Sequence, residues 1–356
     1  MKILLITGSC GLIGSETTDY FSDKFDIIIG IDNDMRSYYF GEVASVDWNR
    51  KRIENQFNNY KHYNVDIREQ SELDNIFREF SMDIKLIIHT AAQPSHDWAA
   101  KEPHTDFSIN ANGTLNLLEF TKKYCPTAKF IFTSTNKVYG DNPNKLPLIE
   151  KKTRFEINKK HKYYKGINET MNIDNCTHSL FGVSKTSSDL MVQEYGKNLG
   201  LFTVIFRAGC ITGTNHSSAE LHGFLSYLVK KSLSKKSYNI IGYKGKQVRD
   251  NIHAEDLISC FWEYYKNPKK KGEFYNIGGS RFSSCSVIEA LNLVEKIKKI
   301  KIKRKYINKA RTGDHIWWIS DISKFKKDYP KFKLNYSFQK IVKEMVKFYS
   351  PEIKEL

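Results

Sequence analysis

The sequence lacks the features that mark several classes of protein. No apolar run reaches the roughly 18 residues that a membrane-spanning helix needs. Its 6 cysteines are scattered over 356 residues without a Cys-x-x-Cys pair, which argues against a disulfide framework or a zinc site and fits a reducing cytoplasm. We see no internal repeat. These absences predict a cytoplasmic protein that uses no metal and does not bind a membrane.

The sequence has a large excess of positive charge, with a formal net charge of +16. The basic residues gather in several stretches, 151–165, 230–236 and 296–311. No nucleic-acid-binding motif accompanies them, so we interpret them as solvated lysine-rich surfaces and expect no nucleic-acid partner. A positive surface also attracts anionic small molecules, and a nucleotide is one of these.

Short apolar runs alternate with segments of helical length and period over the first 210 residues. The predicted strands are 2–7, 25–32, 61–66, 84–90, 129–135 and 202–209, and the clearest predicted helices are 70–81, 107–124 and 181–199. This alternation predicts an α/β fold, a Rossmann-type doubly wound parallel sheet with helices on both faces. Residues 141–180 interrupt the rhythm, and a polar loop of that length is usually functional.

The later part of the chain has a mixed pattern. We expect a helix near 219–234, a strand at 238–241, a helix at 254–266 and a further strand of the main sheet at 273–278. The predicted organisation is a cofactor-binding domain over 1–209, with 246–280 returning to it. Residues 210–245 and 281–356 then form a smaller substrate-binding lobe.

A glycine motif follows the first predicted strand directly. Gly8-x-x-Gly11-x-x-Gly14 opens a helix, as needed for a tight turn and a close approach to a pyrophosphate at the helix N-terminus. Asp32 ends the second strand, where a carboxylate accepts hydrogen bonds from ribose hydroxyls and repels a 2′-phosphate. The motif therefore predicts a dinucleotide site that prefers NAD to NADP; an ordinary glycine-capped turn is the weaker alternative.

The spacing of these glycines resembles that of the extended short-chain dehydrogenase/reductases, which are largely nucleotide-sugar epimerases, dehydratases and reductases. The segments "VDI", "HTAAQ", "NANGTLNLLE", "TSTNKVYGD", "KQVRDNIHAEDL" and "RTGDH" extend the resemblance nearly end to end. The segments "STNKVYGD" and "GKQVRD" are most similar to those of the CDP-tyvelose (CDP-paratose) 2-epimerase group. The resemblance implies a nucleotide-diphosphate sugar as substrate and NAD as cofactor.

The resemblance also implies which residues form the site. For the cofactor these are Gly8, Cys10, Gly11, Leu12, Ile13, Gly14, Asp32, Asn33, Asp66, Ile67, Thr90, Ala91, Ala92, Asn110 and Lys185. For the substrate they are Arg249, Arg311, Asp314 and His222, with Arg249 on the diphosphate. The catalytic positions are Thr135, Phe181 and Lys185, to which we add His96.

Phe181 departs from the pattern of the family, which carries Tyr-x-x-x-Lys here and uses the tyrosine as general base. A phenyl ring cannot exchange a proton, whereas Lys185, four residues on, is retained. The imidazole of His96 is the best-suited replacement, since histidine titrates near neutral pH. Weaker candidates are Asp97, His178, His222, Tyr163 and Tyr164 in the long loop, and Lys185 itself if burial lowers its pKa strongly.

A second departure concerns the reaction type. Dehydratases of the family carry an Asp-Glu pair after the threonine, and Asn136 and Lys137 stand there instead. This departure argues against a 4,6-dehydratase. The resemblance to the 2-epimerase group implies an NAD-dependent C2 epimerase of surface-polysaccharide sugar biosynthesis. The alternatives are another epimerase, a nucleotide-sugar oxidoreductase, or a non-catalytic protein that binds NAD and a nucleotide sugar.

Residues 107–124 and 181–199 resemble the helix pair that forms a homodimer interface in the family. Leu190, Met191, Val192 and Leu199 keep an apolar seam among polar neighbours. We therefore expect a homodimer.

Overall fold

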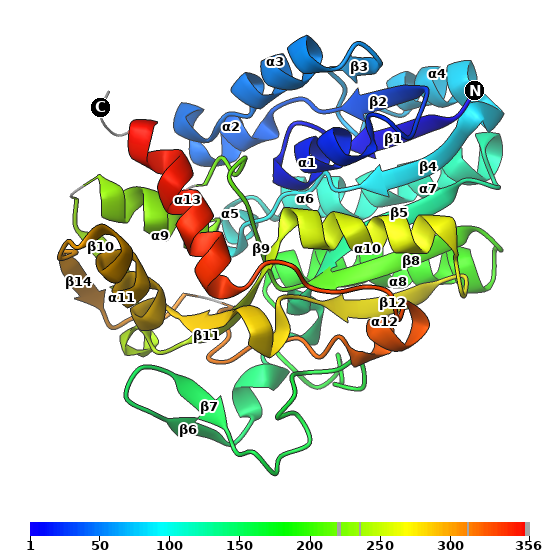
Figure 1. The fold of residues 1–356 in the computed structure, drawn as a ribbon. Coiled ribbons are helices and arrows are strands. Elements are labelled where there is room, and N and C mark those ends of the chain that lie inside the picture. Colours follow the sequence, from blue (N-terminus) through cyan, green and yellow to red (C-terminus); the bar gives the residue numbers. More distant parts are fainter. Residues whose placement is uncertain (219–221, 235, 312, 353–356) are drawn as a thin grey trace. The chain divides into compact units, whose positions relative to one another are not determined.

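The structure, a computed structural model, describes residues 1–218, 222–234, 236–311 and 313–352 (Figure 1). The chain forms two compact units. The first unit comprises Met1–Val138, Ser179–Arg207 and Ile258–Tyr275, and the second comprises Tyr139–His178, Ala208–Leu257 and Asn276–Leu356. Residues 139–178 thus belong to the second unit. The domain boundaries expected from the sequence differ from this division and stay a prediction.

A seven-stranded sheet forms the centre of the first unit. Its strands are β1 (Ile3–Thr7), β2 (Ile27–Ile31), β3 (Tyr60–Tyr63), β4 (Ile84–His89), β5 (Lys129–Thr135), β8 (Phe202–Ala208) and β12 (Glu273–Ile277). They are ordered β12-β8-β5-β4-β1-β2-β3. The pairs β1–β2, β2–β3, β1–β4 and β4–β5 are parallel. This is the doubly wound Rossmann order, and the predicted fold class is confirmed.

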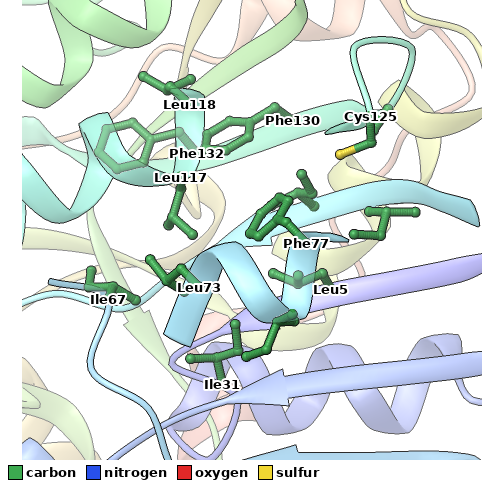
Figure 2. Packing of buried hydrophobic residues seen from close by; sticks show 14 of the residues in the cluster. Leu5, Ile31, Ile67, Leu73, Phe77, Leu117, Leu118, Cys125, Phe130 and Phe132 are labelled. Atoms are coloured by element: carbon green, nitrogen blue, oxygen red, sulfur yellow. The ribbon is translucent and has the colours of Figure 1, made fainter. Parts of the chain in front are cut away.

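The strands are buried on both faces because helices cover each side. On one face, α4 (Gln70–Phe80), α7 (Gly113–Tyr124) and α8 (Leu180–Lys197) pack onto alternate strand residues. Figure 2 shows part of this cluster, in which Leu5 and Phe130 from the sheet lie among Phe77 and Leu117 from the helices. On the other face, Phe21 of α1 (Leu12–Phe21) contacts Trp262 of α10 (Ala254–Lys266) at 5.7 Å between ring centroids.

The remaining helices of the first unit lie in its connections. The α-helices are α2 (Met35–Phe40), α3 (Asp47–Gln56), α5 (His96–Lys101) and α6 (Pro103–Phe107), and the π-helix is η3 (Ser108–Asn112). Short 3-10 helices η1 (Glu42–Ala44) and η2 (Ser81–Asp83) lie between them. The predicted helix 107–124 is thus α7 preceded by the π-turn. A π-turn is typical of functional sites, because one widened turn aims a side chain differently from its neighbours.

Within its described residues, the second unit has its own core and three small sheets. Its strands are β6 (Leu148–Glu150) with β7 (Phe155–Ile157), β9 (Cys210–Thr212) with β11 (Val248–His253) and β13 (Ser284–Ser286), and β10 (Tyr238–Ile241) with β14 (Arg304–Ile307). Its helices include α9 (Phe224–Leu233), α11 (Val287–Lys298), α12 (Ser323–Asp328) and α13 (Phe338–Glu352). Helices α9, α11 and α13 share one hydrophobic cluster.

The predicted helix near 219–234 is α9, and residues 219–221 lie outside the described residues. The segment 141–180 holds the β6–β7 hairpin. Among the described residues, no helix is both long and apolar enough to span a membrane.

Candidate active site

The glycine loop lies at the carboxyl end of β1, where the strand order reverses between β1 and β4. Gly8 has φ +69°, and a Cβ there would lie 2.7 Å from the backbone nitrogen of Ala91. A Cβ on Gly14 would lie 2.2 Å from the carbonyl oxygen of Gly8. These two positions therefore require glycine for the turn and for the close packing of α1.

Gly11 is different, because the space beside it is open. A Cβ there would meet only the Gly8 carbonyl oxygen, at 3.4 Å. Gly11 is the N-cap of α1, and neither a capping side chain nor an acidic residue occupies the first turn, which holds Leu12 and Ile13. The N–H groups of that turn and the positive end of the helix dipole suit an anion such as a pyrophosphate.

Asp32 follows β2 and is hydrogen-bonded to the glycine loop. Its Oδ2 accepts from the backbone N–H of Cys10 at 2.9 Å, and its Oδ1 accepts from the N–H of Asp34 at 2.9 Å. Removal from water raises the pKa of Asp32, and these two N–H groups oppose the rise. The thiol of Cys10 is buried, and burial raises its pKa to about 12, so the loop uses the backbone of this residue.

Asn33 and Asp66 lie together beyond Asp32. The Asn33 amide donates to Asp66 Oδ2 at 3.0 Å, and Arg68 donates to both oxygens of that carboxylate. Burial raises the pKa of Asp66, but the Arg68 hydrogen bonds outweigh it and leave the pKa below its usual value. Ile67 is buried against Gly113, whose Cβ would lie 2.5 Å from it. The loop expected to face the adenine is thus held rigidly.

Thr90, Ala91 and Ala92 follow β4 beside the glycine loop. Thr90 Oγ1 donates to the Thr7 carbonyl at 2.8 Å, which ties the ends of β4 and β1 together. His89, which we did not predict as a site residue, lies between the hydroxyls of Thr7 and Thr114. Burial lowers its pKa well below the usual value, so His89 is a neutral structural histidine.

Asn110 lies in η3 at the centre of a buried polar network. Its amide donates to Asp106 Oδ1 at 3.1 Å and to Ser184 Oγ at 3.0 Å, while its own oxygen accepts from the N–H of Gln93. Burial raises the pKa of Asp106 to about 6. Sequence reasoning missed Asp106; its position four residues before Asn110 in a helical segment was the signal that could have found it.

Lys185 extends from α8 beneath β5. Its Nζ donates to the Thr133 carbonyl at 3.0 Å and lies 4.2 Å from the centroid of the Phe132 ring. Burial lowers the pKa of Lys185 to about 8, opposed by the carboxylates of Asp189 and Asp106. At neutral pH the ammonium form still predominates roughly tenfold. Lys185 therefore acts as a fixed cationic donor at the end of the sheet.

Thr135, Phe181 and His96 all lie in the first unit. Thr135 ends β5, and its Oγ1 accepts from the N–H of Lys137 at 3.3 Å. Phe181 is buried in the first turn of α8, and its ring contacts the imidazole of His96 edge-on, at 5.0 Å between centroids. The fold therefore brings the predicted replacement base against the position that lacks the tyrosine hydroxyl. The neighbouring Asp97 is exposed.

The predicted substrate residues belong to the second unit. Arg249 is a buried residue of β11 that forms an ion pair with Asp314 and donates to the carbonyl of Val248 at 2.7 Å. The N–H of Asp314 donates to the carbonyl of Arg311 at 3.3 Å, so these three residues lie together. His222 lies beside His216, at 5.4 Å between ring centroids. Tyr164 stacks against the Arg281 guanidinium.

The residues of the first unit fit NAD. The open side of Gly11 and the uncapped start of α1 suit the pyrophosphate, Asp32 suits the adenosine ribose, and Lys185 suits a ribose hydroxyl near the nicotinamide. Over the described ranges, no three His, Cys, Asp or Glu side chains come together as they would around a metal ion.

The chain is similar to known proteins over most of its length. Residues 4–278 match the NAD dependent epimerase/dehydratase family. The chain is 31% identical over 328 residues to CDP-paratose 2-epimerase of Salmonella typhi, covering 90% of this chain and 91% of that protein. It is 27% identical to dTDP-glucose 4,6-dehydratase of Salmonella typhimurium, covering 82% and 78%.

Solved structures share the fold. UDP-glucuronic acid 4-epimerase from Bacillus cereus, in complex with UDP-glucuronic acid and NAD, superposes with a TM-score of 0.78 at 22% identity, covering 98% of this chain and 99% of that one. The match to the family model and the near full-length relative confirm the resemblance, the class of enzyme and the NAD cofactor. The chain belongs to the NAD dependent epimerase/dehydratase family.

Proposed function

We propose that the protein is a nucleotide-sugar epimerase that inverts carbon 2 of the sugar, in the formation of surface polysaccharides. The observation that carries this proposal is the 31% identity to a CDP-paratose 2-epimerase, which extends over 90% of this chain and 91% of that one. The similarity includes both units, and therefore both the cofactor side and the predicted substrate side.

The residues after Thr135 favour epimerisation over dehydration. A dehydratase needs an acid for the leaving hydroxyl and a base for the neighbouring carbon. At the two positions concerned the chain carries Asn136, which is buried, and Lys137. Neither an amide nor an ammonium group takes a proton from carbon, so we do not expect loss of water from the sugar.

When bound, NAD would supply the redox chemistry, as acceptor and then donor of the hydride of the sugar carbon. The chain positions the reacting sugar and moves the hydroxyl proton. Thr135 offers a hydroxyl at the end of β5, and Lys185 holds a positive charge in the same unit. Arg249, with Arg311 and Asp314, is our candidate for binding the substrate diphosphate, because Arg suits bidentate phosphate contacts.

The test is turnover of a panel of CDP-, UDP-, dTDP- and GDP-sugars with NAD, followed by proton NMR of the products. We expect inversion at carbon 2 with a deuterium label at that carbon retained, because the hydride returns to the carbon that lost it. Inversion at carbon 4, net oxidation or loss of water would each replace this proposal with another reaction.

A second candidate, a non-catalytic protein that binds NAD and a nucleotide sugar, is favoured by Phe181 alone. Binding of NAD without turnover of any sugar in the panel would support it.

A further inference from the structure

We propose that the Nε2 atom of His96 accepts the proton from the reacting sugar hydroxyl, in place of the hydroxyl that Phe181 lacks. This inference rests on the proposed function, since it names the base of that reaction. It is carried by the contact of the two rings at 5.0 Å and by the hydrogen bond between His96 Nδ1 and Ser179 Oγ at 2.5 Å.

The position of His96 suits a replacement for the missing tyrosine hydroxyl. Phe181 occupies the first turn of α8, four residues before Lys185 and therefore on the same helix face. His96 begins α5, and its imidazole lies edge-on against the Phe181 ring, with 76° between the ring planes. A titratable ring thus stands next to the place where the family carries its proton acceptor.

The hydrogen bond to Ser179 orients the His96 ring. Ser179 is the N-cap of α8, and its Oγ already accepts from the N–H of Gly182 at 3.1 Å. A hydroxyl oxygen has a second lone pair, which can accept from Nδ1–H of His96. We assign the proton of neutral His96 to Nδ1 on this basis, which leaves the lone pair of the imidazole on Nε2.

Hydrogen bonds hold the segment around His96 rigidly. The Ser95 hydroxyl caps α5 by accepting from the N–H of Trp98, and Gln93 donates to the Ser95 carbonyl at 2.9 Å and to Asp106 at 2.8 Å. Asp106 in turn shares the Asn110 amide with Ser184, the neighbour of Lys185. One buried network therefore holds both the His96 backbone and the Lys185 segment of α8, as a preorganised proton acceptor requires.

Two rival bases fit less well. Lys185 has a pKa of about 8, so it is mostly protonated at neutral pH, and its Nζ is engaged by the Thr133 carbonyl. Asp97 follows His96 directly but is exposed. In the proposed step, the hydroxyl proton passes to Nε2 as the carbonyl forms and the carbon's hydride passes to bound NAD. The return step restores both, so protons and electrons balance.

The main test compares His96→Gln and His96→Ala with Lys101→Gln, a control at an exposed residue of the same helix. We expect kcat to fall between about a hundred- and ten-thousand-fold in the His96 variants and to stay within about twofold in the control. NAD affinity, measured by calorimetry, should be unchanged in all three.

The second test needs no turnover. Nitrogen-15 NMR of the histidines, assigned with His96→Gln, reports which ring nitrogen carries the proton. We expect the Nδ1–H form, and we expect Ser179→Ala to mix the two forms. A proton on Nε2 in the wild-type protein would overturn the proposal, because that atom could not then accept another.

The two tests separate this inference from the proposed function. Turnover of a sugar with less than about threefold loss in the His96 variants would overturn the base assignment and leave the epimerase standing. A Phe181→Tyr variant adds a further check, since a tyrosine beside Lys185 should partly restore activity to His96→Ala. Strong activation by Phe181→Tyr alone, with no loss in His96→Ala, would also overturn the proposal.

Discussion

The backbone N–H of Cys10 donates a hydrogen bond to Oδ2 of Asp32 at 2.9 Å. This bond joins the glycine loop to the end of β2 and fixes a carboxylate where the adenosine ribose is expected. Asp32→Asn keeps an oxygen for the Cys10 N–H but removes the charge. We expect the preference for NAD over NADP to fall roughly ten- to a hundredfold, because a hydrogen bond to a charged group contributes about 1.5–3 kcal/mol.

Calorimetric titration with both dinucleotides measures this change. Asp23→Asn is the control, since Asp23 is an exposed carboxylate paired with Lys24 at the surface. Equal affinity of the wild-type protein for NAD and NADP would contradict our interpretation of Asp32.

Arg249 in the second unit is expected to bind the substrate diphosphate. Arg249→Lys keeps the charge but loses the two-pronged geometry of the guanidinium, so we expect KM for the nucleotide sugar to rise about tenfold or more with less effect on kcat. Steady-state kinetics measures both. Arg304→Lys is the matched control, because Arg304 pairs with Glu295 at 2.9 Å in the same unit. An unchanged KM in Arg249→Lys would remove Arg249 from the diphosphate site.

We expect Asp250 to make the stability of the protein depend on pH. It is buried, Oδ2 accepts from the N–H groups of Ser280 and Ser320, and burial raises its pKa from 3.8 to about 6. An acid with a raised pKa in the folded state destabilises the fold above that pKa, and the penalty disappears as pH falls toward the unfolded value. The difference between the folded and unfolded pKa values of Asp250 corresponds to about 3 kcal/mol in the free energy of unfolding.

Asp250→Asn should therefore gain stability relative to the wild type at pH 8 and lose that advantage near pH 4. Urea unfolding of both proteins across this range measures the difference. A stability difference that does not change with pH would show that Asp250 is ionised in the folded protein as easily as in the unfolded chain.

The expected homodimer interface is tested on α8. Leu190 and Leu199 are 47% and 46% exposed, as the predicted seam requires, whereas Val192 is fully buried and Met191 packs partly against the core. Leu115 of α7 and Val183 of α8 are also exposed. We expect Leu190→Lys to shift the protein from dimer to monomer in light scattering at micromolar concentration, because a charge would be buried between subunits.

Ile149→Lys is the control for this substitution. Ile149 is also 47% exposed, but it lies on β6 in the second unit. A wild-type monomer at micromolar concentration, or equal effects of the two substitutions, would contradict the α7–α8 interface.

The spacing of apolar residues in the sequence predicted those helices and strands that can be recognised from this spacing alone. The bounds of β5, β10 and α10 agree with the predicted ranges. A run buried on both faces such as β5, a strand with alternating burial such as β10, and a helix with one apolar face such as α10 are each recognisable without their neighbours. The π-turn η3 and the β6–β7 hairpin were not predicted. A widened helical turn and a short hairpin depend on the residues that pack against them. The spacing of apolar residues along the chain does not encode those contacts.

The sequence by itself determined the glycine loop, Asp32 and the retained Lys185, because each depends on spacing within one strand–helix segment. It also showed that Phe181 lacks a hydroxyl, and it left several replacement bases open. Only the tertiary structure brought His96 to Ser179, which is 83 residues away in the chain, and against Phe181. The selection of His96 among the candidate bases depends on how α5 packs on α8. Packing between helices that are distant in the chain is set by the shapes of both surfaces rather than by either sequence segment alone.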